Sequence, residues 1–321
     1  MKTGVLMVNV GTPSAATATA VRAFLSPFLR DPRVIDLPRW LWYPLLYGFI
    51  LPRRCRTLAQ RYQAIWNAEG SPLAVYSRRQ QQALSEQLTS GIVVQLGMTY
   101  GQPSLGSAIQ ALLTQGVERV IVLPLFPQYS STTTAAVWDQ LAQVLKRYRR
   151  LPQIHFIRDY ATHPLYIQAL KQQLQAAAAQ YGKPDKWLFS YHGIPKRYGQ
   201  QGDDYAQRCQ ATTAAIVSQL SLSSEQWEIS YQSRFGYAAW LTPYTEPKLR
   251  QLARQGVKHL QVICPGFASD CLETLEEIQR QGRAIFIKAG GERFHYIPAL
   301  NDSIAHFDLL YALVQQALTE T

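Results

Sequence analysis

Short apolar runs alternate with longer amphipathic stretches along almost the whole chain. The apolar runs predict strands at residues 5–10, 92–96, 120–126, 154–157, 187–191, 227–231, 260–264 and 284–288. The stretches between them carry apolar residues at helical spacing, notably residues 104–115, 134–147, 164–180, 204–220, 247–255 and 303–318. Strands and helices that alternate in this way predict right-handed βαβ units and mostly parallel sheets.

The eight strands form two blocks of four, which predicts two similar, doubly wound, Rossmann-like α/β domains. We expect the first domain over residues 1–150 and the second over 151–302, with the last helix packing on either. Ligands of such folds bind outside the carboxyl ends of the strands. This rule selects the loops that follow strands, at residues 11–13, 99–101, 127–134, 192–195, 233–236 and 265–270.

Composition narrows the class of protein. Hydrophobic residues at 47% and charged residues at 17% are typical of an ordered globular protein. The net charge of +11 suits nucleic acid, an anionic membrane or an acidic ligand, but no nucleic-acid-binding motif accompanies it, so nucleic acid is not expected. The four cysteines form no Cys-x-x-Cys pair, and the first strand leaves no room for a secretory signal, so we expect a cytoplasmic protein.

An aromatic segment at residues 38–52, followed by arginines up to residue 56, interrupts the alternation. Pro44 and Gly48 divide it, and it is shorter than the ~20 apolar residues that span a bilayer. A buried core helix is one interpretation. Aromatic rings beside arginines are also typical of a peripheral contact with a membrane, here the inner membrane face, or of an apolar lip around a ligand.

His192 ends a predicted strand in the hexapeptide Ser-Tyr-His-Gly-Ile-Pro. Gly193 and Pro195 terminate the strand, which places the imidazole at the ligand-binding edge of the sheet. An imidazole there can accept a proton or bind a metal near neutral pH. A packing histidine is the alternative.

Acidic residues line one stripe of the helix that follows the seventh strand. Asp270, Glu273 and Glu277 fall within about 60° of one another at 100° per residue. Asp270 and Glu273 also fit a capping box, which would be purely structural. Since the histidine and the carboxylates are expected at the same sheet edge, together they suit Fe²⁺ or a similar divalent ion.

Hydroxyl groups at residues 130–134 follow the third strand. Their side chains and the backbone amides suit carboxylate or phosphate groups of a ligand, and a helix N-cap is the equally simple alternative.

Several motifs resemble the ferrochelatase family, in the form found in Gram-negative bacteria, and the resemblance covers essentially the whole chain. They are Asn-Val-Gly-Thr-Pro at 9–13, Gly-Ser-Pro-Leu at 70–73, Pro-Leu-Phe-Pro-Gln-Tyr-Ser at 124–130, the hexapeptide with His192, Gln-Ser-Arg-Phe-Gly at 232–236, and residues 264–278.

The resemblance implies the chelatase fold, with a porphyrin cleft between two domains, and insertion of Fe²⁺ into protoporphyrin IX to form protohaem. It implies His192 and Glu273 as the catalytic and metal-binding pair, with Asp270 and Glu277 continuing a path for protons or metal. It also implies substrate contacts by Tyr100, and we place Tyr129 and Ser130 with it. Whether His192 accepts protons or passes iron stays open, as does whether Glu273 holds metal or relays protons.

The sequence departs from relatives at three positions. Thr99 stands where many relatives have arginine, Cys271 where some have histidine, and Ser131 where some cluster-bearing relatives have cysteine. We therefore expect no iron–sulfur cluster and no bound cofactor, with Fe²⁺ as a substrate, and we favour a monomer. The alternatives are a chelatase for coproporphyrin or a cobalt-accepting tetrapyrrole, and a non-catalytic haem or metal carrier.

Overall fold

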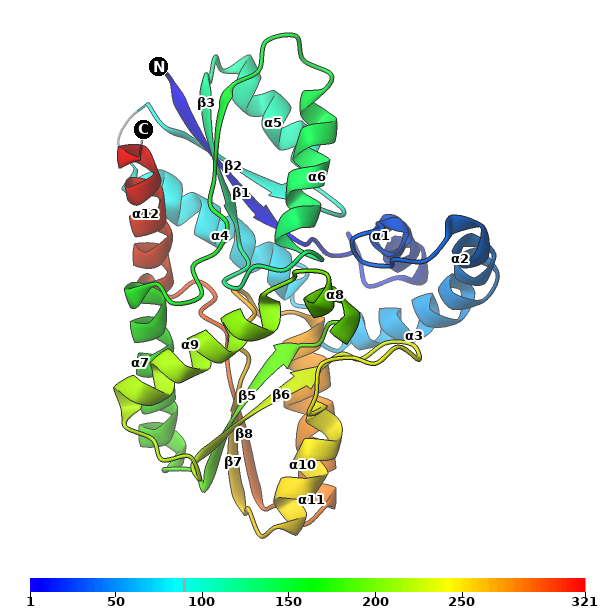
Figure 1. The fold of residues 1–321 in the computed structure, drawn as a ribbon, viewed down its shortest axis with the longest axis vertical. Helices are drawn as coiled ribbons and strands as arrows, with labels where there is room; N and C mark the ends of the chain where they lie inside the picture. Colours follow the sequence, from blue (N-terminus) through cyan, green and yellow to red (C-terminus); the bar gives the residue numbers. More distant parts are fainter. Residues whose placement is uncertain (89–90, 321) are drawn as a thin grey trace. The chain divides into compact units, whose positions relative to one another are not determined.

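A computed structural model of the chain describes residues 1–88 and 91–320. The chain divides into two compact units, which are described one at a time (Figure 1). Unit 1 consists of Met1–Phe126, Ser130–Asp159 and Phe307–Thr321, and unit 2 of Pro127–Tyr129 and Tyr160–His306.

Unit 1 is built on a parallel sheet in the order β2-β1-β3-β4. Its strands are β1 (Thr3–Asn9), β2 (Val93–Met98), β3 (Arg119–Pro124) and β4 (Gln153–Phe156). Its helical segments are α1 (Ala18–Arg30), α2 (Arg39–Leu45), η1 (Leu46–Ile50), α3 (Leu51–Gln63), α4 (Pro72–Gln87), α5 (Leu105–Thr114), α6 (Thr134–Leu145) and most of α12 (Ile304–Thr319). Apolar side chains of β1 and β3 pack against α5 and α6 to form the core.

Unit 2 repeats the plan with a parallel sheet in the order β6-β5-β7-β8. Its strands are β5 (Lys186–His192), β6 (Trp227–Gln232), β7 (His259–Ile263) and β8 (Arg293–Ile297). Its helical segments are α7 (Pro164–Tyr181), α8 (Lys196–Gln200), α9 (Tyr205–Leu220), α10 (Thr245–Arg254), η2 (Glu273–Gly282) and α11 (Arg283–Lys288). Helices α10, η2 and α11 pack on β5, β7 and β8, and the predicted doubly wound α/β class is confirmed.

The strand order locates the ligand-binding edge of unit 2. The chain runs from β5 to β6 on one side and then crosses to β7 on the other, so the winding reverses between β5 and β7. Loops at such a switch point diverge and leave a crevice for ligands at the carboxyl ends of the strands. His192 is the last residue of β5, and the loop after β7 leads into η2, which starts at Glu273.

The eighth strand was predicted at the wrong place. Residues 284–288 belong to helix α11, which continues η2 without a break, and the strand is β8 at Arg293–Ile297. A short run rich in isoleucine and phenylalanine fits a strand and a buried helix equally well. The tertiary structure decides, because Phe286 is fully buried against the sheet while Gly290, at φ +111°, ends the helix and turns the chain into β8.

The aromatic segment is not a buried core helix. It forms α2, the short π-helical stretch η1 and the start of α3, and its apolar side chains are largely exposed. Trp40 is 75% and Phe49 57% exposed, whereas Trp42 is only 5% exposed and donates its indole N–H to the carbonyl of Leu29 at 2.7 Å. Of the helices in the described ranges, none is long and apolar enough to cross a membrane.

Candidate functional site

The imidazole of His192 is held in one orientation by the backbone that follows it. Its Nδ1 lies 2.7 Å from the carbonyl oxygen of Gly193, which can only accept a hydrogen bond. In the neutral ring Nδ1 therefore carries the proton, and Nε2 keeps its lone pair. The rings of Trp240 and Phe267 flank the imidazole, with centroids at 6.4 and 6.5 Å.

Gly193 permits the turn that holds the histidine. A Cβ atom at this position would lie 3.0 Å from the carbonyl oxygen of Gln232 and 3.1 Å from the indole ring of Trp240. The Gly193 amide also donates to that Gln232 carbonyl at 2.8 Å. A side chain would thus separate the end of β5 from β6, and the absence of a Cβ keeps the two strand ends in contact.

The acidic segment forms a π-helix rather than an ordinary α-helix. Helix η2 covers Glu273–Gly282, and π-helical turns, with i→i+5 hydrogen bonds, occur frequently at functional sites. The capping-box interpretation was wrong, because no side chain caps this helix and the Asp270 carboxylate is bound by other donors.

Glu277 is a carboxylate with a perturbed environment. Its Oε1 accepts the Ser233 amide at 2.7 Å and its Oε2 accepts the Ser233 hydroxyl at 2.6 Å. Burial raises the pKa of the Glu277 carboxyl, and the charge of Glu273 raises it further; the Ser233 donors and a positive charge on His192 oppose the shift. Glu277 therefore interacts electrostatically with both His192 and Glu273.

Gln232 connects this site to the sheet. It stands opposite His192 in the parallel register of β5 and β6, and its Nε2 donates to the carbonyl of Glu273 at 2.7 Å. Its Oε1 accepts a hydrogen bond from the Ser190 hydroxyl at 2.7 Å and another from the Cys264 thiol at 3.4 Å. The amide of one buried side chain thus fixes the start of η2 relative to the end of β5.

Asp270 is buried at 4% exposure below the first turn of η2. Its Oδ1 accepts from the Tyr296 hydroxyl at 2.6 Å, the Thr274 hydroxyl at 2.9 Å and the Ala299 amide at 3.4 Å. Its Oδ2 accepts from the Asn301 side-chain amide at 2.7 Å. Neither Tyr296 nor Asn301 was singled out from the sequence, because no motif marks either of them.

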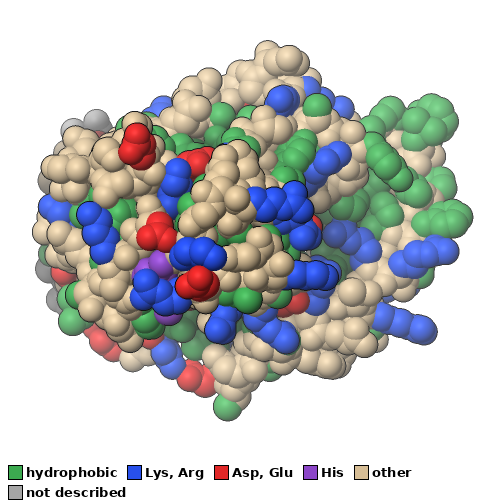
Figure 2. All heavy atoms as spheres, turned by 90° about the horizontal axis from the view of Figure 1, so that it is seen from below, with side chains coloured by type: hydrophobic (Ala, Val, Ile, Leu, Met, Phe, Trp, Pro, Cys, Tyr) green, Lys and Arg blue, Asp and Glu red, His purple; other side chains and the backbone are tan. Residues whose placement is uncertain are grey.

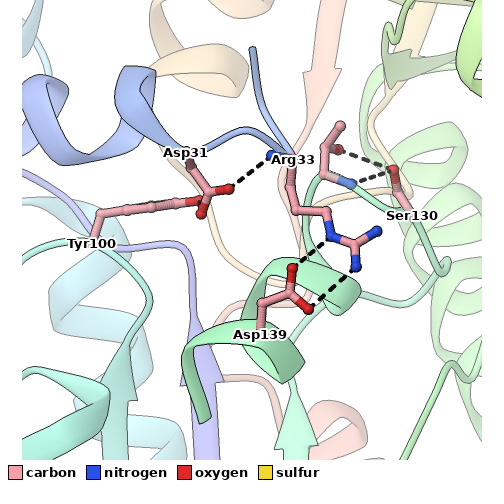
Figure 3. Close-up of polar contacts among 6 residues, drawn as sticks. Asp31, Arg33, Tyr100, Ser130 and Asp139 are labelled. Atoms are coloured by element: carbon pink, nitrogen blue, oxygen red, sulfur yellow. Dashed lines mark hydrogen bonds and ion pairs between the residues drawn. The ribbon is translucent and has the colours of Figure 1, made fainter. Parts of the chain in front are cut away.

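The predicted substrate contacts Tyr100 and Ser130 belong to unit 1, whereas Tyr129 belongs to unit 2. Tyr100 is buried and donates its hydroxyl to Asp31 at 2.8 Å (Figure 3). Burial, reinforced by the charge of Asp31, raises the pKa of Tyr100 well above its usual range, so it remains a donor.

The backbone around Asp31 is tied down in turn. Asp31 also accepts the backbone amide of Arg33, whose guanidinium forms a two-point ion pair with Asp139 on α6 at 2.7 and 3.2 Å (Figure 3). The buried Ser130 hydroxyl bonds to the amide and hydroxyl of Thr132. The hydroxyls of Tyr100 and Ser130 are therefore engaged within the protein.

The possible metal donors in unit 2 are an imidazole and carboxylates. Within residues 1–88 and 91–320, no three His, Cys, Asp or Glu side chains converge closely enough to hold a metal ion by themselves. Imidazole and carboxylate, the donors found here, both bind Fe²⁺.

Two parallel sheets of the same order, with a histidine and carboxylates at the switch point of the second, define a two-domain α/β chelatase fold. SirB from Bacillus subtilis with Fe3+ superimposes with a TM-score of 0.59 at 11% identity, covering 99% of this chain and 96% of that one. CbiX, the terminal enzyme for biosynthesis of siroheme in denitrifying bacteria, superimposes with a TM-score of 0.52 at 13% identity, covering 98% and 100%. These likenesses establish the fold.

The family follows from sequence. The ferrochelatase family model matches residues 2–318, and the chain belongs to that family. It is 59% identical to the ferrochelatase of Yersinia enterocolitica over 318 residues, covering 99% of this chain and 98% of the relative. It is 57% identical to that of Yersinia pestis (strain Pestoides F) over 314 residues, covering 98% of each. The expected assignment as a metal chelatase is confirmed.

Proposed function

We propose that the chain inserts Fe²⁺ into protoporphyrin IX at the carboxyl edge of the unit 2 sheet, forming protohaem and releasing two protons. The observation that carries this proposal is the hydrogen bond that leaves Nε2 of His192 free, beside an electrostatic interaction of His192 with Glu277, which in turn interacts with Glu273. The ferrochelatase family of the chain supplies the porphyrin and the iron.

The reaction breaks two pyrrole N–H bonds and forms iron–nitrogen bonds, while iron remains Fe²⁺. We assign proton acceptance to His192, because its Nδ1 hydrogen bond leaves a single lone pair at Nε2 for the pyrrole proton. The resulting imidazolium is stabilised by the nearby carboxylates.

Glu273 and Glu277 have complementary roles in this proposal. Glu273 holds the incoming Fe²⁺ at the start of η2, where Gln232 fixes its backbone. Glu277, whose pKa is raised by burial, takes up the proton from His192 and passes it outward. Ser233 accommodates both the ionised and the protonated carboxyl of Glu277. Its amide donates to one carboxyl oxygen, and its hydroxyl can donate to the other oxygen or accept a hydrogen bond from it.

The residues of the 98–134 region have a supporting role. We place the ring of Tyr100, rather than its hydroxyl, against the macrocycle, because the hydroxyl is bound to Asp31. We propose that Tyr129 and the backbone near Ser130 bind the carboxylates of the porphyrin. The buried Ser130 hydroxyl holds this backbone through its bond to the Thr132 amide.

Anaerobic turnover tests the assignment. Wild-type protein with Fe²⁺ and protoporphyrin IX is expected to consume porphyrin fluorescence over many cycles, and coproporphyrin to be the poorer substrate. His192→Ala and Glu273→Gln should lower kcat by about 100-fold or more. Glu246→Gln, at an exposed acid of α10, is the matched control. Near-normal rates for both site variants, folded as judged by circular dichroism, would refute the assignment.

We further propose that α2 and η1 make a peripheral membrane contact. Their exposed apolar residues include Trp40, Leu41, Leu45 and Phe49. Figure 2 shows hydrophobic side chains gathered at its right edge, the side on which α2 lies in Figure 1, with Lys and Arg side chains beside them. Arg53 lies 5.4 Å from the Phe49 ring, as expected for a cation at headgroup level.

Vesicle sedimentation tests the membrane contact. A Trp40→Ser, Leu41→Ser and Phe49→Ser triple variant should lose binding to anionic vesicles while it still turns over detergent-dispersed porphyrin. Trp42 is excluded from the test because it is buried and holds the α1 carbonyl. Unchanged sedimentation of the triple variant would remove the membrane role.

We propose in addition a cytoplasmic monomer without an iron–sulfur cluster. The spacing of the four cysteines, which form no Cys-x-x-Cys pair, supports the absence of a cluster. Acid-labile sulfide in purified protein would contradict the absence of a cluster, and a sedimentation mass above 36.3 kDa would contradict the monomer.

A further inference from the structure

We propose that Asp270 is a structural anion and that Asn301 is a positioning residue for chelation, because the two together fix the first turn of η2 and hence Glu273. The inference rests on the proposed role of Glu273. It gives Asp270 a holding role in place of a step in the proton or metal path.

The hydrogen bonds of Asp270 carry the first step. Donors from four residues bind the carboxylate, three of them at Oδ1 (Tyr296, Thr274 and Ala299) and one at Oδ2 (Asn301). With 4% exposure and this set of donors, Asp270 has little capacity left for an iron ion. The donors instead fix the carboxylate in one place.

Asn301 contributes a reciprocal contact. The backbone amide of Asp270 donates to Asn301 Oδ1 at 2.7 Å, and Asn301 Nδ2 donates back to Asp270 Oδ2 at 2.7 Å. This pair of bonds fixes which end of the Asn301 amide faces the carboxylate. Asn301 adopts φ +49°, a region that Asn and Asp enter more readily than other non-glycine residues.

The backbone of Asn301 is itself secured. Its amide donates to the carbonyl of Ala268 at 3.1 Å, and its carbonyl accepts from Nδ1 of the buried His306 at 2.8 Å. Asn301 is therefore bonded through its side chain, its amide and its carbonyl at once. Such a residue can hold a neighbouring carboxylate without moving.

Asp270 transmits this constraint to η2 through Thr274. The fully buried Thr274 donates its hydroxyl to Asp270 Oδ1 at 2.9 Å and accepts the Cys271 amide at 3.0 Å, which closes the turn that precedes the helix. Glu273 lies within that turn, and Gln232 holds its carbonyl from the other side. The backbone position of Glu273, from which its carboxylate projects, is thus set by two contacts, and one of them depends on Asp270.

A residue exchange distinguishes holding from relaying. Asn301→Asp alone sets two buried carboxylates against each other and should lower kcat at least about tenfold, with little change in KM for porphyrin. Adding Asp270→Asn restores a pair of one carboxylate and one amide, with the negative charge now at position 301 instead of 270. The carboxylate at position 301 can accept the backbone N–H of residue 270, and it can also accept the side-chain amide of that residue. We expect this double variant to recover to within about threefold of wild type.

Three results would each overturn the inference. The first is a double variant that stays as slow as Asn301→Asp. The second is a rate about 100-fold lower for both Asp270→Asn and the double variant. Either result would show that the carboxylate at position 270 is itself needed for the reaction. Wild-type rates for Asn301→Asp would show that the contact does not position anything. Asp308→Asn, an exposed acid on α12, is the matched control.

Folding and the proposed function are checked separately. If Asn301→Asp fails to fold, Tyr296→Phe removes one donor while keeping the ring, and it should reduce kcat while leaving KM unchanged; a Tyr296→Phe variant with wild-type kcat would then oppose the inference. If the proposed function is wrong, Glu273→Gln should instead keep full activity, whatever the activity of the Asp270→Asn, Asn301→Asp double variant.

Discussion

The buried histidine at the start of α12 gives a pH dependence that can be worked out from the structure. His306 is 1% exposed, and burial lowers its pKa from 6.5 to about 4. Its Nδ1 donates to the carbonyl of Asn301, a bond that opposes this lowering of the pKa but is outweighed by burial. Replacement by Asn retains a donor near the position of Nδ1 and removes the titration.

The sign follows from proton linkage. Between pH 6.5 and pH 4 the unfolded chain binds a proton that the folded protein does not, so acid lowers the free energy of unfolding. The loss is about 1.3 kcal/mol between pH 7.5 and pH 5.5, and about 2.5 kcal/mol by pH 4.5. It approaches about 3 kcal/mol below pH 4, where both states are protonated.

Equilibrium urea unfolding of wild type and His306→Asn at these pH values measures the effect. The stability difference between the two proteins should narrow by the stated amounts as the pH falls, since other titrating groups cancel. His306→Gln is the control, because any neutral replacement should give the same pH dependence. A difference that stays constant from pH 7.5 to pH 4.5 would refute a buried neutral imidazole at this position.

Three other substitutions follow from the site and the aromatic segment. Ser233→Ala removes the hydroxyl bond that stabilises the Glu277 carboxylate by about 1.5–3 kcal/mol, so the pKa of Glu277 seen in the pH profile of kcat should rise. An unchanged pH profile would exclude Glu277 from the reaction. Gly193→Ala should lower kcat about tenfold or more without loss of the fold, because the added Cβ would lie 3.0 Å from the Gln232 carbonyl oxygen. A normal rate of metal insertion in a stopped-flow assay would contradict this prediction. Trp42→Ala should destabilise by about 3–5 kcal/mol, measured by thermal unfolding, whereas an equally stable variant would show that this indole is not packed as described.

Much of the fold was predictable because it rests on local patterns. Seven of the eight strands were predicted close to their positions, since each is an apolar run bounded by polar or turn residues. The exception, residues 284–288, has a composition that suits a strand and a helix equally. Only the packing of Phe286 and the turn at Gly290 make it a helix.

The aromatic segment shows a second limit of prediction from local patterns. Trp40 and Trp42 lie two residues apart and share the same local composition, but one is exposed and the other is buried against the end of α1. Residue type gives the tendency of a tryptophan to lie at an interface. Which tryptophan does so depends on the direction in which α2 meets its neighbours.

The sequence by itself determined the two blocks of βαβ units, the loops at the carboxyl ends of the strands and the positions of His192 and Glu273 at one sheet edge. These depend on periodicity and on the rule that ligands bind at the carboxyl ends of strands. Only the tertiary structure decided which nitrogen of His192 is free, that η2 is a π-helix, and that Asp270 bonds to Tyr296 and Asn301 rather than capping a helix. The reason is physical: hydrogen-bond partners from distant segments depend on distances of a few tenths of an ångström, which no local pattern specifies.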